Sequence, residues 1–504
     1  MQKGISLLQR ILFIIPLLAF VTDAMAQNLP GARGSLYSEV LKEERVFQVV
    51  LPHNYKPGSA EKYDVLYILD GDSNLKSIAA IQQFAQDESY LPPIIMVAVF
   101  NTNRDRDFLP THVAPKPSGG ADKFLAFFKQ ELIPHINKTY PSNGNNLLFG
   151  HSFGGVLAMQ ALLTEPQLFN SYLAVDPSFW WDGGYMHKTA AGKLSSSVLS
   201  GKSLFIAGRE GDGLTGMGIT SMDAVLKSSA PKDLNWKVVA YADETHGSIR
   251  LKSVYDGLRF FYDGYSSKPI EFHPMNGVVL KDKPYKVYYF GNSQSVRYAT
   301  DGSEPTPSSR KMEPEITLTN GTKLVAKSLG RNDRYNNSTV GEFTVGKALA
   351  PSAKPSQATP GGFQYSYYEG EWDALPDFGK LKPIESGIAG KGFDINQLPR
   401  QTNFACLFEG YIEIQKAGYY IFVLDSDDGS KLFLGDKLLV SHDGLHGDGN
   451  PKTYLVPLEK GFYPVRMEYF QKGGGAALKL EYVVPGEEKP RPIPVPFELQ
   501  YAGR

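Results

Sequence analysis

The chain has little cysteine, little net charge and few long apolar runs. Its 504 residues contain one cysteine, Cys406, so no intramolecular disulfide can form. Lysine and arginine (52) nearly balance aspartate and glutamate (53), for a formal net charge of −1. This balance gives no reason to expect a nucleic acid or an anionic membrane surface as a partner. Only the N-terminus carries a long apolar run, and no later segment is expected to span a membrane.

The N-terminus has the parts of a secretory signal peptide in their usual order. Lys3 and Arg10 precede the core of the apolar stretch ILFIIPLLAF, and Ala-Met-Ala follows at 24–26. The apolar core is short for a membrane anchor, so we expect cleavage after Ala26. Cys406 lies far from this point and cannot be a lipid-modified cysteine there. A secreted chain without disulfides fits a bacterium better than a eukaryotic route, so the sequence predicts a periplasmic or extracellular protein.

Two kinds of hydrophobic pattern divide the rest of the chain. Up to about residue 267, continuous apolar runs alternate with helical patterns, as in a parallel sheet covered on both faces. The runs expected to be buried strands are 65–69, 94–100, 146–150, 171–176, 203–208 and 236–242. Later segments are short and alternating, as in antiparallel β structure. The sequence therefore predicts an α/β hydrolase-type domain, with a mostly parallel sheet flanked by helices, and two all-β sandwich domains. The expected boundaries are 1–26 (signal peptide), 27–267 (α/β domain), 268–346 (small immunoglobulin-like sandwich), 347–362 (linker rich in Pro, Ala and Ser) and 363–504 (second sandwich).

A strand, a sharp turn and a helix are expected over residues 145–162, NNLLFGHSFGGVLAMQAL. Ser152 lies in the turn, within a G-x-S-x-G motif. Such an elbow needs small residues beside the serine because backbone segments crowd there, and Gly150, Gly154 and Gly155 supply them. The motif alone is weak in a glycine-rich chain. Its strand-turn-helix context favours Ser152 as a nucleophile over a structural turn serine.

A serine hydroxyl needs a base to act as a nucleophile. The histidines that follow Ser152 in this domain are His187 and His246, and only His246 follows a clear strand, in the loop DETHGS. The carboxyl ends of parallel strands are where functional groups gather in open sheets. His246 is therefore the expected base, and a loop histidine bonded to nearby backbone is the alternative.

The acid that would orient the imidazole is less defined. Glu210 follows the strand SLFIAG and is our first choice, with Asp212 as the second. Asp243 and Glu244 are immediate neighbours of the histidine and are expected to be solvated loop charges. Another residue, or no functional acid, remains open at this point.

Backbone and aromatic groups complete the expected site. The N–H groups of Phe153 and of Asp72, in the loop DGDSN, are the candidate donors of an oxyanion hole. Arg104, in NTNRDRDFLP, is a candidate contact for a polar or anionic substrate group, with Arg–Asp pairing as its alternative. Trp180 and Trp181, in DPSFWWDGG, are candidates for an aromatic substrate wall, with core packing as theirs.

Six segments together resemble the bacterial esterase family of α/β hydrolases, which includes siderophore, feruloyl and acetyl-xylan esterases and S-formylglutathione hydrolases. The resemblance covers about residues 35–264 and implies Ser152 and His246 as the catalytic pair. Some members resemble a dyad rather than a triad, which leaves the role of Glu210 open. The GHSFGG and NTNRDRD segments resemble the siderophore-esterase branch most. The six segments are EVLKEERVFQVVLPHNY, DVLYILDGDSN, NTNRDRDFLPT, GHSFGG, DPSFWW and HGSIRLKSVYDGLRFFYD.

Both β regions carry resemblances of their own. VRYATDGSEPTPSSRKM, at 296–312, is similar to the small C-terminal domain of chitobiases and hexosaminidases, which implies a spacer. Residues 363–501 resemble the protective-antigen-type β-sandwich, often a carbohydrate-binding module. In its lectin-like members an Asp-Asp pair coordinates Ca²⁺, and Asp427 and Asp428 occupy that place here. A purely structural SDDG turn is the alternative.

Taken together, the sequence predicts a secreted serine esterase that forms an acyl-enzyme on Ser152. Catalysis is expected to need no cofactor. The accessory modules favour acetyl or feruloyl esters on glycans as the substrate. One alternative is a siderophore-type or general small-ester hydrolase. The other is a non-catalytic glycan-binding or adhesion protein.

Overall fold

The computed structural model describes residues 31–196, 198–265, 267, 269–291, 295–330, 335–354, 359–389, 392–487, 491–492 and 500–502. The expected signal peptide and its cleavage site lie outside this range and stay predictions. In the part that is described, no helix combines the length and apolar character needed to cross a membrane. The chain divides into two compact units. One ends at Leu258, and the other takes in Gln86–Pro92 and the residues from Arg259 on.

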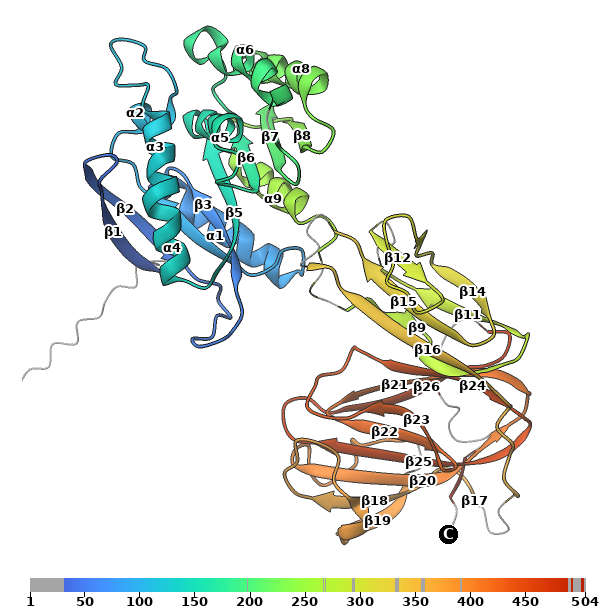
Figure 1. Cartoon of the computed structure of the whole chain (residues 1–504). Helices are drawn as coiled ribbons and strands as arrows, with labels where there is room; N and C mark the ends of the chain where they lie inside the picture. Colours follow the sequence, from blue (N-terminus) through green and yellow to red (C-terminus); the bar gives the residue numbers. More distant parts are fainter. Residues whose placement is uncertain are drawn as a thin grey trace, which may run out of the picture. The chain divides into compact units, whose positions relative to one another are not determined.

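A single sheet frames the first unit (Figure 1), with eight strands among the described residues in the order β1-β2-β4-β3-β5-β6-β7-β8. The six expected strands are confirmed as β3 to β8, and these run parallel. The sequence does not predict β1 and β2, which extend one edge of the sheet in antiparallel pairing, because polar residues interrupt their apolar pattern. The strands are β1 (Ala32–Ser38), β2 (Glu43–Val50), β3 (Tyr63–Ile68), β4 (Ile94–Val99), β5 (Ser142–His151), β6 (Ser171–Val175), β7 (Ser203–Arg209) and β8 (Asn235–Tyr241).

Helices cover both faces of this sheet. On β6, Tyr172 belongs to the core shared with α3 and α5, whereas its neighbour Leu173 meets α9, where a Cβ at Gly257 would lie 2.6 Å from Leu173. Successive side chains of a strand point to opposite faces, so these two contacts identify the two covering layers. The helices are α1 (Gly71–Asp87), α2 (Arg104–Phe108), α3 (Ala121–Phe127), a π-helical turn (Phe128–Leu132), α4 (Ile133–Thr139), α5 (Phe153–Thr164), α6 (Trp181–Ser196), α7 (Asp212–Gly216), α8 (Ile219–Ser229) and α9 (Ile249–Phe261).

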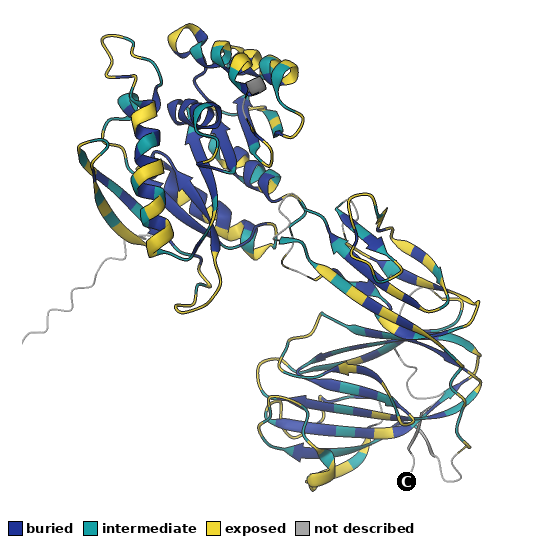
Figure 2. Cartoon of the chain, in the orientation of Figure 1, coloured by how far each residue is buried: buried dark blue, intermediate teal, exposed yellow. Residues whose placement is uncertain are grey.

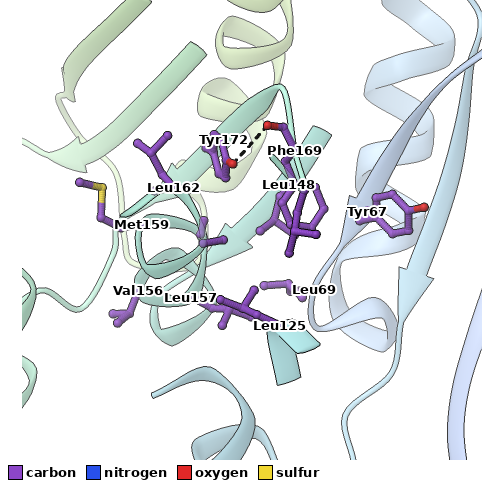
Figure 3. Close-up of a cluster of buried hydrophobic side chains, with 14 of the residues drawn as sticks. Tyr67, Leu69, Leu125, Leu148, Val156, Leu157, Met159, Leu162, Phe169 and Tyr172 are labelled. Carbon is purple, nitrogen blue, oxygen red and sulfur yellow. Dashed lines mark hydrogen bonds between the residues drawn. The ribbon is translucent and has the colours of Figure 1, made fainter. Parts of the chain in front are cut away.

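The core is densest around α5. Every residue of β3, β4 and β6 is buried, and the central strands are dark along their length in Figure 2. Helix α5 is buried from Phe153 to Leu163, as expected of a helix that is apolar on all sides. Figure 3 shows its Val156, Leu157 and Met159 in the same cluster as strand residues, with Tyr172 donating a 3.2 Å hydrogen bond to the Phe169 carbonyl. This packing fixes the first turn of α5, which Ser152 directly precedes.

Strands are the main regular secondary structure described in the second unit, in agreement with the expected β character. A 3₁₀ turn covers Phe378–Lys380. The strands are β9 (Phe272–His273), β10 (Asn276–Leu280), β11 (Pro284–Tyr289), β12 (Val296–Ala299), β13 (Arg310–Lys311), β14 (Glu315–Thr319), β15 (Thr322–Ser328), β16 (Ser338–Gly346), β17 (Thr359–Pro360), β18 (Phe363–Glu369), β19 (Glu385–Ala389), β20 (Phe404–Ile414), β21 (Gly418–Asp427), β22 (Ser430–Leu434), β23 (Lys437–His442), β24 (Lys452–Leu458), β25 (Gly461–Gln471), β26 (Ala477–Val483), β27 (Arg491–Pro492) and β28 (Gln500–Ala502).

The two expected β domains share one sheet. Strand β10 pairs in parallel with β16 on one side and with β24 on the other, so one sheet runs through both regions. Gly277 makes this contact close, because a Cβ there would lie 2.4 Å from the carbonyl oxygen of Leu455. One hydrophobic cluster also spans both, with Val279 and Tyr285 beside Ile421, whereas a second cluster of buried residues lies wholly within 363–482. The second β region therefore has a core of its own, but the shared sheet and the shared cluster join both regions in one compact unit.

Part of the expected linker, 347–362, pairs with strands. The Leu349 amide donates to the Pro457 carbonyl at 2.8 Å, and the Ser352 amide donates to the Phe462 carbonyl at 2.8 Å. Residues 355–358 lie outside the described part. The linker prediction is wrong for residues 349–352, because their backbone groups find partners in the second β region.

Candidate active site

Ser152 lies on a sharp elbow between β5 and α5. Its φ of 59° and ψ of −116° are rare for a residue with a side chain, and such strain is typical of functional sites. A Cβ at Gly150 would lie 2.0 Å from the carbonyl oxygen of Gly154, and one at Gly155 would lie 2.7 Å from Pro177 Cβ. Gly154 itself has room for a Cβ, with nothing nearer than 3.5 Å. Two of the three expected glycines are thus required by space.

His246 lies in the loop after β8 and binds Asp176, the first residue after β6. Its Nδ1 is 2.6 Å from Asp176 Oδ2. Asp176 is fully buried, whereas 42% of the His246 side chain is exposed. Burial by itself would raise the pKa of Asp176, but its hydrogen bonds to His246 and Arg209 outweigh burial and lower it. Asp176 therefore stays a carboxylate that fixes the imidazole in its surface position.

Glu210 and Asp212 are not the acid beside His246. Both are exposed, and the Glu210 amide donates to the Tyr241 carbonyl at 3.0 Å, which extends the pairing of β7 with β8. Asp176 was missed because DPSFWW was interpreted as a pocket wall. A usable signal was present: an aspartate directly after a buried strand, between the serine and the histidine in chain order.

Neighbouring side chains bring the elbow and the histidine loop together. His151 Nε2 lies 2.7 Å from the His246 carbonyl oxygen, and the two imidazole rings are 4.4 Å apart. Burial, together with the nearby His246, lowers the pKa of His151 to about 4, so His151 is neutral at physiological pH and its Nε2–H can donate. Ser152 Oγ is 3.1 Å from Ser178 Oγ, and no described hydrogen bond joins it to His246. In enzymes without bound substrate, the hydrogen bond between a catalytic serine and its histidine is often long, and it shortens only when substrate binds.

Both expected oxyanion donors lie at helix N-termini. Phe153 is the first residue of α5 and Asp72 the second of α1, and the first N–H groups of a helix have no acceptor within the helix. The two helices follow β3 and β5, which are adjacent and parallel, so their N-termini lie at the same edge of the sheet. This arrangement can stabilise an anion.

The structure places Arg104 against protein groups. Its Nε donates to Asp70 Oδ1 at 2.7 Å and its Nη2 to Asp70 Oδ2 at 3.1 Å. Nη2 is also 3.2 Å from the carbonyl oxygen of His151. The expected substrate contact is therefore wrong for this arrangement, because the guanidinium already holds a carboxylate. The alternative of Arg–Asp pairing fits, although the partner comes from another loop.

The two tryptophans differ in how far they are buried. Trp181 is 6% exposed, belongs to the main core, and donates through Nε1 to Thr111 Oγ1 at 3.0 Å, so its expected role as a substrate wall is wrong and it serves as core packing. Trp180 is 47% exposed, with its ring 6.0 Å from that of Phe153, the residue after the nucleophile. Trp180 remains a predicted substrate contact.

The Asp427–Asp428 pair lies at the turn between β21 and β22. Asp428 is 6% exposed, and its two carboxylate oxygens accept the amide protons of His446 (3.2 Å) and Lys472 (2.9 Å). Within the described ranges, no three or more His, Cys, Asp or Glu side chains gather as metal ligands. Calcium needs six to eight oxygen ligands, so these residues fit the structural turn better, and calcium binding stays a prediction.

The sheet order, the serine elbow and the pairing of His246 with the buried Asp176 give the first unit the fold of an α/β hydrolase and the side-chain arrangement expected of a serine hydrolase site. Comparison with known proteins agrees. Residues 38–223 match the family model described as "Putative esterase", and residues 391–495 match the PA14 domain model. The protective-antigen-type resemblance is thereby confirmed, whereas the chitobiase-type resemblance of 268–346 stays a prediction.

Several curated relatives and solved structures are similar to this chain. Ferri-bacillibactin esterase BesA of Bacillus subtilis is 28% identical over an alignment of 185 residues, and the match covers 32% of this chain and 64% of that protein. Siderophore enterobactin esterase of Emericella nidulans is 32% identical over an alignment of 167 residues, and the match covers 28% of this chain and 54% of that protein. A solved IroE-like serine hydrolase of Shewanella oneidensis shows 33% identity, with a TM-score of 0.45, 47% of this chain covered and 82% of that one. The chain spans less than two thirds of the length of these two curated relatives.

Proposed function

We propose that the first unit is a carboxylic ester hydrolase that works through an acyl-enzyme on Ser152. The observation that carries the proposal is the 2.6 Å contact of His246 Nδ1 with the buried Asp176, beside a serine on a strained elbow. Because Nδ1 is bound to the carboxylate, Nε2 is the nitrogen that takes the Ser152 proton and later returns it to the leaving alkoxide. The N–H groups of Phe153 and Asp72 stabilise the oxyanion. Water then releases the acyl group.

Siderophore esters are the first substrate class that we propose. Of the two curated relatives described above, one is named a ferri-bacillibactin esterase and the other a siderophore enterobactin esterase. The esterase family model matches residues 38–223, which include Ser152. Acetyl or feruloyl esters on glycans are the second class, favoured by the PA14 match at 391–495. A secreted protein, periplasmic or extracellular, would meet either substrate. The carbohydrate-binding role of the PA14 region is part of this second proposal.

Turnover by the full mature chain tests the proposal. The substrates are p-nitrophenyl acetate and butyrate, a catecholate trilactone with and without Fe³⁺, and acetylated and feruloylated oligosaccharides. Ser152→Ala is the matched control and should lower kcat by about 10⁶-fold if serine is the nucleophile. Preference for the trilactone would assign the siderophore class, and preference for the oligosaccharides would assign the glycan class. If wild type and Ser152→Ala are equally inactive on every ester, the hydrolase proposal is rejected and a non-catalytic glycan-binding protein is favoured.

A further inference from the structure

Arg104 joins the two loops that carry the proposed oxyanion donors. Its bidentate contact with Asp70, at 2.7 and 3.1 Å, reaches the residue two positions before Asp72. Its contact with the His151 carbonyl, at 3.2 Å, reaches the residue two positions before Phe153. A single guanidinium therefore bonds to both loops close to their donor groups. Its planar, forked donors suit this double contact, and a lysine could not reproduce it.

Asp70 is nearly buried and contacts several neighbouring groups besides Arg104. Its side chain is 10% exposed, and Asn101 Nδ2 donates to Oδ1 at 2.6 Å. Its other oxygen lies against the elbow, since a Cβ at Gly154 would be 3.7 Å from Oδ2. The φ of Asp70 is 51°, a value that residues with side chains seldom adopt and that persists only where surrounding contacts enforce it. The Arg104 contact is thus one of the bonds that fix the backbone entering α1.

Helix α2, which Arg104 begins, is held in place by several contacts. Its N-terminus is capped by Asn103. At the other end of the helix, Asp107 Oδ2 accepts from Arg45 Nη1 at 2.7 Å, and only 1% of the Arg45 side chain is exposed. Arg106 also bonds to Glu43 on β2. The buried Arg45–Asp107 pair and the partly exposed Arg106–Glu43 pair connect α2 to the sheet, so both resist a movement of the segment that carries the guanidinium.

We propose that Arg104 is a positioning residue that holds the Asp72 and Phe153 N–H groups at the spacing needed for one oxyanion. The inference rests on the proposed ester hydrolysis. Because Asp70 neutralises the guanidinium, Arg104 contributes alignment rather than affinity for a charged substrate. A donor displaced by about 1 Å can cost about 10²-fold in rate, with little effect on ground-state binding.

The test compares Arg104→Met, Arg104→Lys, Asp70→Asn and the double variant R104M/D70N in the full chain. The substrates are neutral p-nitrophenyl acetate and anionic mono-p-nitrophenyl succinate. We expect kcat to fall about 10²-fold in each methionine or asparagine variant, on both substrates alike, with KM within about threefold of wild type. Arg104→Lys should recover part of the rate. The double variant should lose no more than the single ones, because both remove the same contact.

A rise in KM confined to the anionic ester would overturn the proposal in favour of a substrate contact. So would additive losses in the double variant, or unchanged kcat. Hydrogen exchange of the free protein gives a readout that needs no turnover. The amides of 70–74 and of 151–155 should exchange faster in R104M and in the isosteric D70N, and unchanged exchange would also overturn the proposal. Failure of the hydrolase proposal itself is distinct, because the wild type would then be inactive on every ester.

Discussion

His246 Nδ1 lies 2.6 Å from Asp176 Oδ2, across 70 residues of sequence. Arg209 Nε donates to the same oxygen at 2.6 Å, while Asp176 Oδ1 is buried and has no hydrogen-bond partner among the described residues. One oxygen of a fully buried carboxylate therefore holds both a histidine and an arginine. The carboxylate is inside the domain and the imidazole at its surface, where an ester can reach it.

Replacing this carboxylate should disable the histidine. Asp176→Asn keeps the size of the side chain but removes its charge and favours the wrong tautomer of His246, so we expect kcat/KM to fall by about 10⁴-fold. Glu210→Gln is the matched control and should stay within about threefold of wild type, because Glu210 is exposed and makes no described contact with His246. Steady-state kinetics on p-nitrophenyl acetate measures both. Equal activity of D176N and wild type would mean that Ser152 and His246 act as a dyad.

Arg209 should help to keep Asp176 charged. Burial alone would raise the pKa of this carboxyl, but the hydrogen bonds from His246 and Arg209 lower it. Arg209→Met removes one of these two contacts, so we expect kcat/KM on p-nitrophenyl acetate to fall by about tenfold or less, since 29% of the Arg209 side chain is exposed and solvent screens it. Arg209→Lys keeps the charge and should lose less. Equal activity of R209M and wild type would contradict this electrostatic account.

His151 should make the first unit sensitive to mild acid. Its pKa is lowered from 6.5 to about 4, so the unfolded chain binds a proton more readily than the native one. The stability that the neutral imidazole contributes is present above pH 6.5 and is lost as the pH falls toward 4. Between pH 7 and 5 the loss is about 2 kcal/mol. Urea unfolding of wild type and His151→Gln, followed by tryptophan fluorescence, should show a smaller pH dependence in the variant. Parallel pH dependences would count against the prediction.

The elbow glycines should differ in their tolerance of alanine. Gly150→Ala puts a Cβ 2.0 Å from a backbone oxygen and should abolish activity and lower the melting temperature. Gly154→Ala has 3.5 Å of space and should keep activity within about threefold of wild type. Differential scanning fluorimetry and ester turnover measure the pair. Similar behaviour of the two variants would show that crowding at the elbow is not what selects glycine at 150.

The Asp427–Asp428 turn should be indifferent to calcium. Because both oxygens of Asp428 already accept backbone protons, adding Ca²⁺ or a chelator should leave the melting temperature unchanged. Asp428→Ala should lower stability by about 1–3 kcal/mol in either condition, because two partly buried backbone amides lose their acceptor. A melting temperature that rises with Ca²⁺ in wild type, but not in Asp427→Asn, would establish the lectin-type site instead.

Local patterns were sufficient to single out the proposed nucleophile and the proposed base. Ser152 carries a motif whose meaning is set by the strand before it and the helix after it, and His246 follows a recognisable strand. Both signals lie within about ten residues of sequence. The same reasoning leads to Glu210 and passes over Asp176, because each follows a strand and no local pattern measures the distance to an imidazole.

Long-range contacts decided the rest. The Arg104–Asp70 pair spans 34 positions and looks like two solvated loop charges when each segment is considered alone. In the same way, the continuous sheet through β10 depends on pairing between Asn276 and Tyr454. No turn motif or residue spacing in the sequence predicts this pairing. Hydrogen bonds between distant strands depend on tertiary packing, and a register cannot be inferred from one strand.

By itself, the sequence determined the alternation of strands and helices, the strand-turn-helix elbow around Ser152 and the β character of the second unit, because burial and turn chemistry act on neighbouring residues. Only the tertiary structure decided which carboxylate meets His246, that Arg104 binds Asp70, and that the two β regions share a sheet. Those outcomes depend on which side chains meet after the chain has folded. Burial makes these contacts specific, because a charge or an amide that is removed from water needs a hydrogen-bond partner inside the protein.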